Sequence, residues 1–168
     1  AGLDASESRT DALLLLTLDS AENAVRMLSI PRDTLIHPTD GVSKLNGVYG
    51  INGGGQQGTD ALLAQVEAIT GLRPDGYMIM GLPALEAVVD ALGGVEFDVP
   101  MDMAYADPSQ DLVIALHAGK QTLDGEDASK LVRFRSGYED ADLGRIKVQR
   151  DFLAALIDTA VSANGLWK

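Results

Sequence analysis

Near the N-terminus, two apolar runs are separated by a short polar break. The first run, Asp11–Asp19 (DALLLLTLD), is apolar at nearly every position between its two aspartates. The second run, Ala24–Ile30 (AVRMLSI), ends at Pro31, and the SAEN between the two runs has the composition of a turn. We therefore expect two neighbouring strands, the first of them buried on both faces.

The middle of the chain predicts two helices. The first begins at Thr59, a candidate N-cap, and ends at Gly71, a residue type that often follows the last helical turn. The second carries Pro83 in its first turn and ends at Gly93. Short apolar runs that predict strands lie on either side of this second helix, at 76–81 and 95–99.

The C-terminal part predicts a loop followed by two more helices. Residues 100–111 have a loop pattern, and a helix is expected to start near Asp124. A longer amphipathic helix is expected at 142–161, with its apolar side formed by Leu143, Ile146, Phe152, Leu153, Leu156 and Ile157. Strands and helices alternate without a linker, which predicts a single α/β or α+β domain over 1–168 with a central mixed β-sheet flanked by helices.

Composition makes the positions of the cations informative. The 168 residues are 46% hydrophobic and 23% charged, which is ordinary for a globular fold. The 25 acidic residues outnumber 13 basic ones, and the net charge of −12 disfavours sequence-independent binding to nucleic acid. A bound phosphate would therefore need a local concentration of cations. Five of the 13 lie between Arg133 and Arg150.

Common catalytic motifs are absent. The chain has no cysteine, no GxxxxGK[ST], HExxH or GxSxG motif, and only two histidines, His37 and His117, far apart in sequence. No apolar stretch reaches the roughly 20 residues that span a bilayer. The glycine run at 53–55 could hold an anion through its amides, although such runs before helices are usually turns.

The arginines near the C-terminus give a stronger indication of ligand binding. Arg133 and Arg135 would point to one side of an extended segment. Asp142, Arg145 and Gln149, spaced three and four apart, would share a helical face, and we expect that face to differ from the apolar one. Neighbouring guanidinium groups repel one another unless an anion neutralises them, and phosphate suits their planar donor geometry.

Arg32 and two aspartates extend the candidate site. Arg32 follows Ile-Pro at a strand end, where ligand sites in α/β sheets tend to lie. Asp4 and Asp11 flank the entry to the first strand, and paired carboxylates beside a phosphate suit Mg²⁺. Turn-forming and capping roles also fit these aspartates, and each arginine could simply form a surface ion pair, such as Arg145 with Asp142.

The order of six segments extends the argument beyond single motifs. They are GLDASESRTDALLLLTLD, LSIPRDT, KLNGVYGINGG, VVDALGGVEFDVP, LHAGKQTLDGEDASKLVRFR and DADLGRIKVQRDFL. Together they resemble the LytR-CpsA-Psr family of cell-envelope phosphotransferases, from Gly2 to about Leu156. The resemblance implies an extracytoplasmic catalytic domain that follows an N-terminal helix anchored in the bacterial cytoplasmic membrane. It also implies a hydrophobic pocket for the lipid tail and an arginine-lined mouth for the pyrophosphate.

The resemblance also assigns roles to individual residues. Asp4 and Asp11 match Mg²⁺-associated aspartates, and Arg9 matches the arginine of the R-x-D motif. Arg32 matches the arginine of S-I-P-R-D and would contact the pyrophosphate, with Asp33 as a supporting partner. Near the same pocket, Lys44 and Asn46 match a K-x-N segment, and Arg133, Arg135, Arg145 and Gln149 match an R-x-R…R-I-x-R-Q series that grips the phosphates.

The implied reaction is a Mg²⁺-dependent transfer of a glycopolymer from a polyprenyl-pyrophosphate carrier to peptidoglycan or another envelope acceptor. The catalytic groups would be Asp11, Arg32, Arg133, Arg135 and Arg145, and Arg9, Asp33, Lys44, Asn46 and Gln149 would bind the substrate. Hydrolysis of the polyprenyl pyrophosphate could be a side activity. Asp11 and a metal-bound hydroxide both stay open as the base. The family often has a basic residue before the final Gln where this chain has Val148, and an Arg after the first Asp where it has Ser6.

Two alternatives have other functions. A non-catalytic module that captures polyprenyl phosphate or an acidic envelope glycan would use the same arginines. Direct DNA binding as a transcriptional regulator is disfavoured by the net charge of −12 and by the lack of a recognisable helix-turn-helix.

Overall fold

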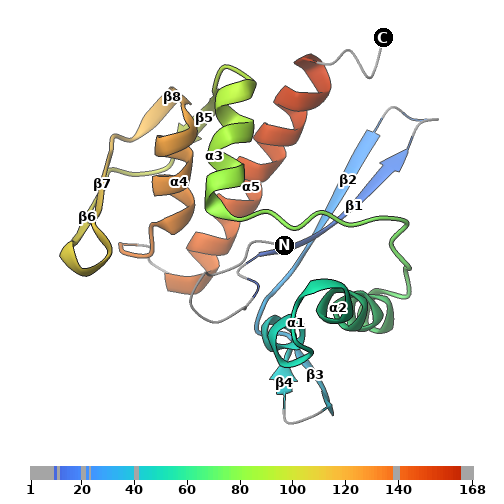
Figure 1. The fold of residues 1–168 in the computed structure, drawn as a ribbon. Helices are drawn as coiled ribbons and strands as arrows, with labels where there is room; N and C mark the ends of the chain where they lie inside the picture. The colour runs from blue at the N-terminus through green and yellow to red at the C-terminus, as the bar shows by residue number, and fades with distance from the viewer. Residues whose placement is uncertain are drawn as a thin grey trace. The chain divides into compact units, whose positions relative to one another are not determined.

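The computed structural model describes residues 10, 12–19, 22, 24–39, 42–137 and 141–163. Its contacts divide the chain into two compact units, residues 1–81 and 82–168. Each unit contains both strands and helices, so the expected α/β or α+β class is confirmed (Figure 1). Strand pairing is more local than the central mixed sheet that was expected: the described strands form four two-stranded antiparallel sheets. The assignment of 1–168 to one domain stays a prediction.

The first unit begins with the expected hairpin. Strands β1 (Leu13–Asp19) and β2 (Ala24–Ile30) pair antiparallel, with Leu13 opposite Ile30. At the turn, the Glu22 amide donates to Asp19 Oδ1 at 3.1 Å. Burial of β1 on both faces was wrong: Leu18 is 69% exposed, because the core of the unit packs only on the Leu13 and Ile30 end of the hairpin.

The remaining elements of the first unit build its core. They are β3 (Leu35–Thr39), β4 (Val42–Lys44), the 3-10 helix η1 (Leu45–Gly47), α1 (Val48–Ile51) and α2 (Gly55–Thr70). Helices α1 and α2 lie side by side (Figure 1). The buried cluster comprises Leu13, Ile30, Leu45, Val48, Leu62 and Val66.

Helix α2 starts earlier than its sequence suggested. Its N-cap is Gly54, not Thr59, and the Thr59 hydroxyl instead donates to the Gly55 carbonyl one turn back within the helix, at 2.8 Å. Glycines outside the usual backbone regions allow the chain to enter the helix here without a polar cap. The expected end is confirmed, because Gly71 adopts the left-handed conformation with φ 71° and bonds to the Glu67 carbonyl.

The second unit consists of three helices and a long interrupted hairpin. Its elements are α3 (Leu82–Ala91), β5 (Val95–Val99), β6 (Met103–Asp107), the 3-10 helix η2 (Pro108–Gln110), β7 (Leu112–Leu116), β8 (Gly119–Leu123), α4 (Gly125–Arg133) and α5 (Ala141–Ala163). Helix α4 packs on α3 and on α5, and α5 packs on β5. The Phe97 and Phe152 rings meet edge to face, 5.5 Å apart, and help to join β5 to α5.

The hairpin is interrupted where its two ladders change register. Beyond the Val99–Gly119 pair, residues 100–102 on one strand face only residues 117–118 on the other before pairing resumes at Met103–Leu116. Pro100 has no amide to donate to a ladder, which explains why the segment 100–102 carries an extra residue at this break. The Ala118 amide donates to Asp102 Oδ1 at 2.7 Å across the break.

Two sequence predictions in this region were wrong. Residues 76–81 have no strand partner in the described part of the chain, and the side chains of Tyr77 and Met78 are exposed. Residues 100–111 were expected to be loop but include strand β6, whose partner β7 supplies the ladder. In both cases a distant partner, which a local apolar pattern cannot reveal, decides whether a segment is a strand.

The helices of the second unit follow their sequence signals more closely. Asp124 caps α4 by accepting the Asp127 amide at 2.9 Å, and Pro83 lies in the first turn of α3. Helix α5 has the expected extent to within two residues at each end. None of the helices within the described ranges is both long and apolar enough to cross a membrane.

Gly58 provides a test of the packing between α1 and α2. A Cβ atom at this position would lie 2.4 Å from the Tyr49 carbonyl oxygen. Alanine in place of glycine normally strengthens a helix, but here it would force the two helices apart. We expect Gly58→Ala to lower the free energy of unfolding by about 2 kcal/mol, measured by chemical denaturation. The exposed neighbour Gln57→Ala serves as the control, and equal stability of the two variants would contradict this packing.

Candidate functional site

In the first unit, backbone hydrogen bonds join three segments that carry predicted site residues. The Asn46 amide donates to the Arg32 carbonyl at 2.9 Å, and the Leu45 amide donates to the Thr34 carbonyl at 3.0 Å. The Thr10 amide donates to the Asn46 carbonyl at 3.2 Å. Arg32, Lys44 and Asn46 therefore belong to one local structure, and the backbone at residue 10 adjoins it. Asp4, Arg9 and Asp11 lie outside the described residues.

A tight turn holds Arg32 and Asp33 at the end of β2. The Thr34 amide and the Thr34 hydroxyl both donate to the Pro31 carbonyl, at 2.9 and 2.6 Å. Pro31 has a fixed φ, and the two bonds to its carbonyl close the turn around the next two residues. Leu45, which follows the last residue of β4, is fully buried and anchors the opposite strand.

The charged side chains of this turn contact one another. Lys44 Nζ donates to Asp33 Oδ1 at 3.0 Å, and Asp33 Oδ2 lies 3.8 Å from Arg32 Nε. The three side chains are 25% (Arg32), 47% (Asp33) and 54% (Lys44) exposed, so they are accessible to a ligand. We call these residues, together with Asn46, the turn cluster.

A buried hydroxyl next to position 11 bears on the predicted Mg²⁺ site. Thr10 is 1% exposed, and its Oγ1 has no hydrogen-bond partner within the described structure. Buried hydroxyls are nearly always satisfied, by protein, water or an ion. A hydroxyl oxygen is a donor type that Mg²⁺ accepts, whereas the predicted ligands Asp4 and Asp11 lie outside the described residues. Among the described residues, no group of three or more carboxylate and histidine side chains could hold a metal.

The glycine run before α2 does not offer its amides to an anion. The Gly53 amide donates to the Gly50 carbonyl, the Gly54 amide to the Tyr49 carbonyl and the Gly55 amide to the Tyr49 hydroxyl, each at 3.0 Å. The donors of this loop are thus used within the protein. The run has the turn role that its sequence favoured.

In the second unit, Arg133 and Arg135 flank a buried phenylalanine. Arg133 is the last residue of α4, and Phe134, 2% exposed, follows it in extended conformation. The Phe134 amide bonds to the Lys130 and Leu131 carbonyls, which closes the helix. Arg135 is exposed and has no ion pair within the described part of the chain. Anchoring of Phe134 fixes the backbone that carries both arginines.

Arg145 lies on the buried face of α5, which corrects the expected separation of the arginine and apolar faces. It is 7% exposed and shares a stripe, at spacings of three and four, with Val148, Phe152 and Leu156. The expected apolar side correctly included Phe152 and Leu156, but it also included Ile146, which is only partly buried, and it left Arg145 out. Val148 is buried in the same stripe and is therefore a core residue.

Gln149 uses its amide to hold α4 against α5. Its Nε2 donates to the Val132 carbonyl at 2.7 Å, one residue before Arg133. The carbonyls of a last helical turn have no partner within their own helix, so this bond satisfies one of them. Sequence spacing alone could not show the contact, because it joins residues on two different helices. The predicted role of Gln149 in substrate binding stays a prediction.

Lys130, one turn before the arginine pair, is engaged by its own helix. Its Nζ lies 2.7 Å from Glu126 Oε1 and 3.1 Å from Asp127 Oδ1. The hydrogen bond to Glu126 raises the pKa of Lys130 above its ordinary value, against the opposing effect of burial. This cation is neutralised within α4.

The cations on either side of Gln149 on α5 are also paired. Asp151 accepts hydrogen bonds from Arg150 Nη2 at 2.7 Å and from Lys147 Nζ at 3.0 Å. Burial alone would raise the pKa of Asp151, but these hydrogen bonds outweigh it and lower the pKa below its ordinary value. Lys147 and Arg150 are therefore weaker candidates for ligand contacts than Arg135.

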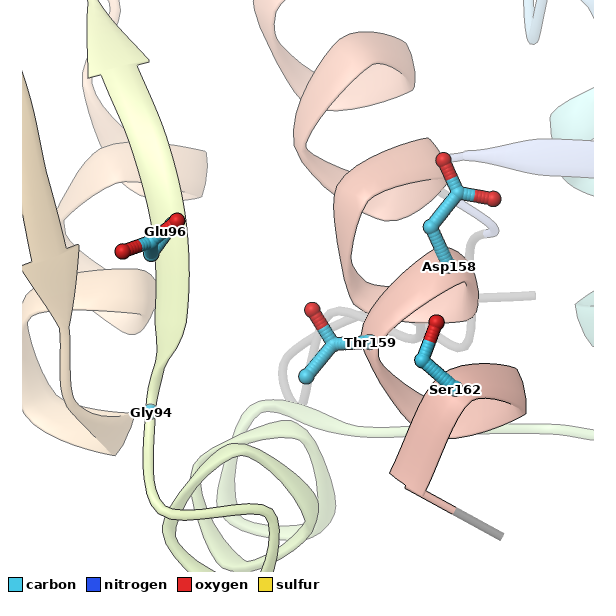
Figure 2. Close-up of a pocket in the computed structure, with 5 residues that line it drawn as sticks. All are labelled: Gly94, Glu96, Asp158, Thr159 and Ser162. Atoms are coloured by element: carbon cyan, nitrogen blue, oxygen red, sulfur yellow. The ribbon is translucent and has the colours of Figure 1, made fainter. Parts of the chain in front are cut away.

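A hollow of about 540 Å³ in the second unit is lined by none of the predicted site residues. Figure 2 shows Gly94 and Glu96 on the β5 side, and Asp158, Thr159 and Ser162 on α5. Two carboxylates and two hydroxyls line it, a chemistry that suits neither a prenyl chain nor a pyrophosphate.

Comparison with known proteins gives one consistent family. The model of the LytR_cpsA_psr family matches residues 1–168. Polyisoprenyl-teichoic acid–peptidoglycan teichoic acid transferase TagV of Bacillus subtilis is 31% identical over 167 residues, which are 96% of this chain and 41% of that protein. The probable cell wall biosynthesis protein LcpB of Corynebacterium glutamicum is 37% identical over 166 residues, which are 98% of this chain and 37% of that protein. The chain thus spans less than half of the length of these two relatives.

Solved structures agree with the sequence comparison. LytR-CPS2A-psr family protein YwtF (TagT) with bound octaprenyl pyrophosphate lipid superposes with a TM-score of 0.72 and 29% identity. The match covers 96% of this chain and 62% of that one.

The contact between Gln149 and Val132 predicts a loss of stability when it is removed. We expect Gln149→Ala to lower the free energy of unfolding by about 1 kcal/mol, because it leaves a half-buried carbonyl without its donor. Thermal denaturation of the wild type, of Gln149→Ala and of a control variant is the measurement. The control is Gln121→Ala, which removes an exposed hydrogen bond to the His117 carbonyl and should change stability little. Unchanged stability in Gln149→Ala would mean that this bond does not hold α4 and α5 together.

Proposed function

Because this chain belongs to the LytR-CpsA-Psr family, we propose that it carries the catalytic machinery of a phosphotransferase. The enzyme moves a glycopolymer from a polyprenyl-pyrophosphate carrier to peptidoglycan or another acceptor of the cell envelope. Two kinds of observation support the proposal: relatives named as teichoic acid transferases, and a relative solved with octaprenyl pyrophosphate. Within this chain, the turn cluster carries the proposal, since it collects exposed cations in a protein of net charge −12.

The reaction requires little covalent chemistry from the protein. An acceptor hydroxyl attacks the phosphorus that bears the glycan and loses its proton. The bond from that phosphorus to the bridging oxygen breaks, and polyprenyl monophosphate leaves. Phosphoryl transfer of this kind is accelerated mainly by positioning and by neutralising charge on the phosphate oxygens. In this proposal Arg32 and Lys44 neutralise that charge, and Asn46 is a further donor to the phosphates.

Mg²⁺ is the proposed cofactor, held by Asp11 and Asp4. When bound, it would neutralise charge on the pyrophosphate oxygens. The Thr10 backbone amide donates to the Asn46 carbonyl, so residue 10, next to the proposed ligand Asp11, adjoins the turn cluster. Arg9 is proposed as a substrate-binding residue in the same stretch.

The arginines of the second unit are proposed to bind phosphate oxygens as well. Arg135 is the strongest candidate because it is exposed and lacks an ion pair within the described residues. Arg133 adjoins it at the end of α4. Arg145 is buried, where a guanidinium must be paired or hydrogen-bonded. Its orientation is therefore fixed, and its contribution to phosphate binding depends on that orientation.

The proposed location is the outer face of the bacterial cytoplasmic membrane, where carrier and acceptor meet. A membrane helix upstream of Ala1 is part of this proposal. Nucleic acid is not a proposed partner, because the net charge of −12 repels its phosphates.

Replacement of Arg32 tests the proposed activity. Purified protein is incubated with a polyprenyl pyrophosphate, with and without Mg²⁺, and the monophosphate product is measured by chromatography. We expect Mg²⁺-dependent cleavage by the wild type and a loss of about 100-fold in Arg32→Ala, as for removal of a group that stabilises transition-state charge. Arg26→Ala is the matched control, because Arg26 lies on β2 and pairs with Asp19 and Glu22.

Each outcome of that assay has a distinct meaning. Binding of the lipid without cleavage would replace the transferase by a lipid-capture module. Full activity in Arg32→Ala would remove the turn cluster from the site.

Arg135 gives an independent test in the second unit. We expect Arg135→Ala to lower turnover by about tenfold or more without unfolding the protein, because the side chain is exposed. Arg150→Ala, which removes an arginine already paired with Asp151, should retain activity. The same assay with far-ultraviolet circular dichroism of both variants checks the result. Equal turnover in the two variants would exclude Arg135 from phosphate binding.

A further inference from the structure

Asp33 stands between two cations from different segments of the chain. One carboxylate oxygen accepts a hydrogen bond from Lys44 Nζ at 3.0 Å, and the other lies 3.8 Å from Arg32 Nε. Arg32 is its neighbour in the turn, whereas Lys44 is eleven residues away at the end of β4. A single carboxylate thus links the S-I-P-R-D turn to the K-x-N segment.

The backbone around Asp33 is held firmly, so this link is a built feature. The two bonds from Thr34 to the Pro31 carbonyl close the turn, and the amides of Leu45 and Asn46 fasten it to η1, which follows β4. The Asp33 carboxylate therefore projects from a braced corner. The fold sets the position of the Asp33 backbone, and Arg32 and Lys44 reach its carboxylate from two different segments.

These ion pairs contribute little to the stability of the fold. The Asp33 and Lys44 side chains are 47% and 54% exposed, and exposed ion pairs contribute little because water screens them. Two cations that lie close together repel each other, and a carboxylate between them reduces the repulsion while limiting their motion. Such an arrangement orients both cations at the expense of some attraction for an incoming anion.

We propose that Asp33 is a positioning residue that orients Arg32 and Lys44 for a phosphate group. The proposal rests on the proposed function, because it presupposes that these two cations bind the pyrophosphate of the donor. Lys44 has three N–H donors and uses one for Asp33, so it can keep that bond and still contact a phosphate oxygen. Asp33 Oδ2 lies 3.8 Å from Arg32 Nε, so the ion pair approaches one edge of the guanidinium.

This arrangement predicts opposite effects on binding and on turnover. Asp33→Asn removes a negative charge beside the anion site, so affinity should rise. The same change releases the two cations from their fixed orientation, so the chemical step should slow. A residue that only supported the fold would lower stability and weaken both properties together.

The test combines a binding measurement with kinetics. Isothermal titration calorimetry with inorganic pyrophosphate should show that Asp33→Asn binds about threefold to tenfold more tightly than the wild type, the effect of removing one nearby screened charge. With a polyprenyl pyrophosphate, kcat should fall by about tenfold while KM does not rise. Asp33→Glu, which restores the charge, should recover part of kcat. Asp19→Asn is the matched control, since Asp19 pairs with Arg26 at the other end of the hairpin.

A double-mutant cycle keeps the inference independent of any single variant. In a Lys44→Ala background, Asp33→Asn should give a smaller gain in affinity for pyrophosphate, because one of the two cations it restrains is gone. Additive effects, or unchanged pyrophosphate affinity in Asp33→Asn, would overturn the role of Asp33. Absence of cleavage in the wild type, with the predicted affinity changes intact, would instead refute the proposed transferase and leave Asp33 as an organiser of an anion-binding site.

Discussion

The hydrogen bond from the Asn46 amide to the Arg32 carbonyl fastens together the part of the molecule on which the proposed chemistry depends. It joins the end of β2 to the segment after β4, and with the neighbouring bond from Leu45 it makes a braced corner of two stretches that are far apart in sequence. Leu45 is fully buried, so the core of the first unit sets the position of this corner. Two cations, Arg32 and Lys44, are thereby held in one place, although the protein as a whole has a net charge of −12.

The same principle recurs in the second unit with different groups. Phe134 is buried between Arg133 and Arg135, and the amide of Gln149 fastens the last turn of α4 to α5. Apolar anchors and side-chain bonds to backbone carbonyls fix the arginines there, while the nearby cations Lys130 and Arg150 are neutralised by carboxylates on their own helices. These contacts show that Lys130 and Arg150 are neutralised, which residue type alone does not reveal.

Local signals in the sequence predicted those elements whose ends are set by nearby residues. The β1–β2 hairpin, the cap of Asp124 on α4 and the left-handed Gly71 after α2 all depend on neighbours within a few positions. Strand β6 was missed because its partner β7 lies beyond a turn that the pattern did not reveal. Arg145 was expected on a face apart from the apolar one, yet it is buried with Phe152 and Leu156, because only packing shows which helical positions are covered.

For the site, the sequence motifs identified candidate residues but could not show how those residues contact one another. Motif matching named Arg32, Lys44 and Asn46, but only the folded chain shows the backbone bonds that join them and the Asp33 carboxylate between two of the cations. Side-chain contacts between separate segments have no signature in residue spacing, which is why the link made by Gln149 was also absent from the sequence argument.

The central claim is that the turn cluster binds the pyrophosphate of a lipid carrier. The most direct measurement is a crystal structure of the protein with geranylgeranyl pyrophosphate and Mg²⁺. The account predicts phosphate oxygens within hydrogen-bonding distance of the Arg32 guanidinium and Lys44 Nζ. A pyrophosphate bound elsewhere, with Arg32 and Lys44 in contact only with Asp33, would contradict it.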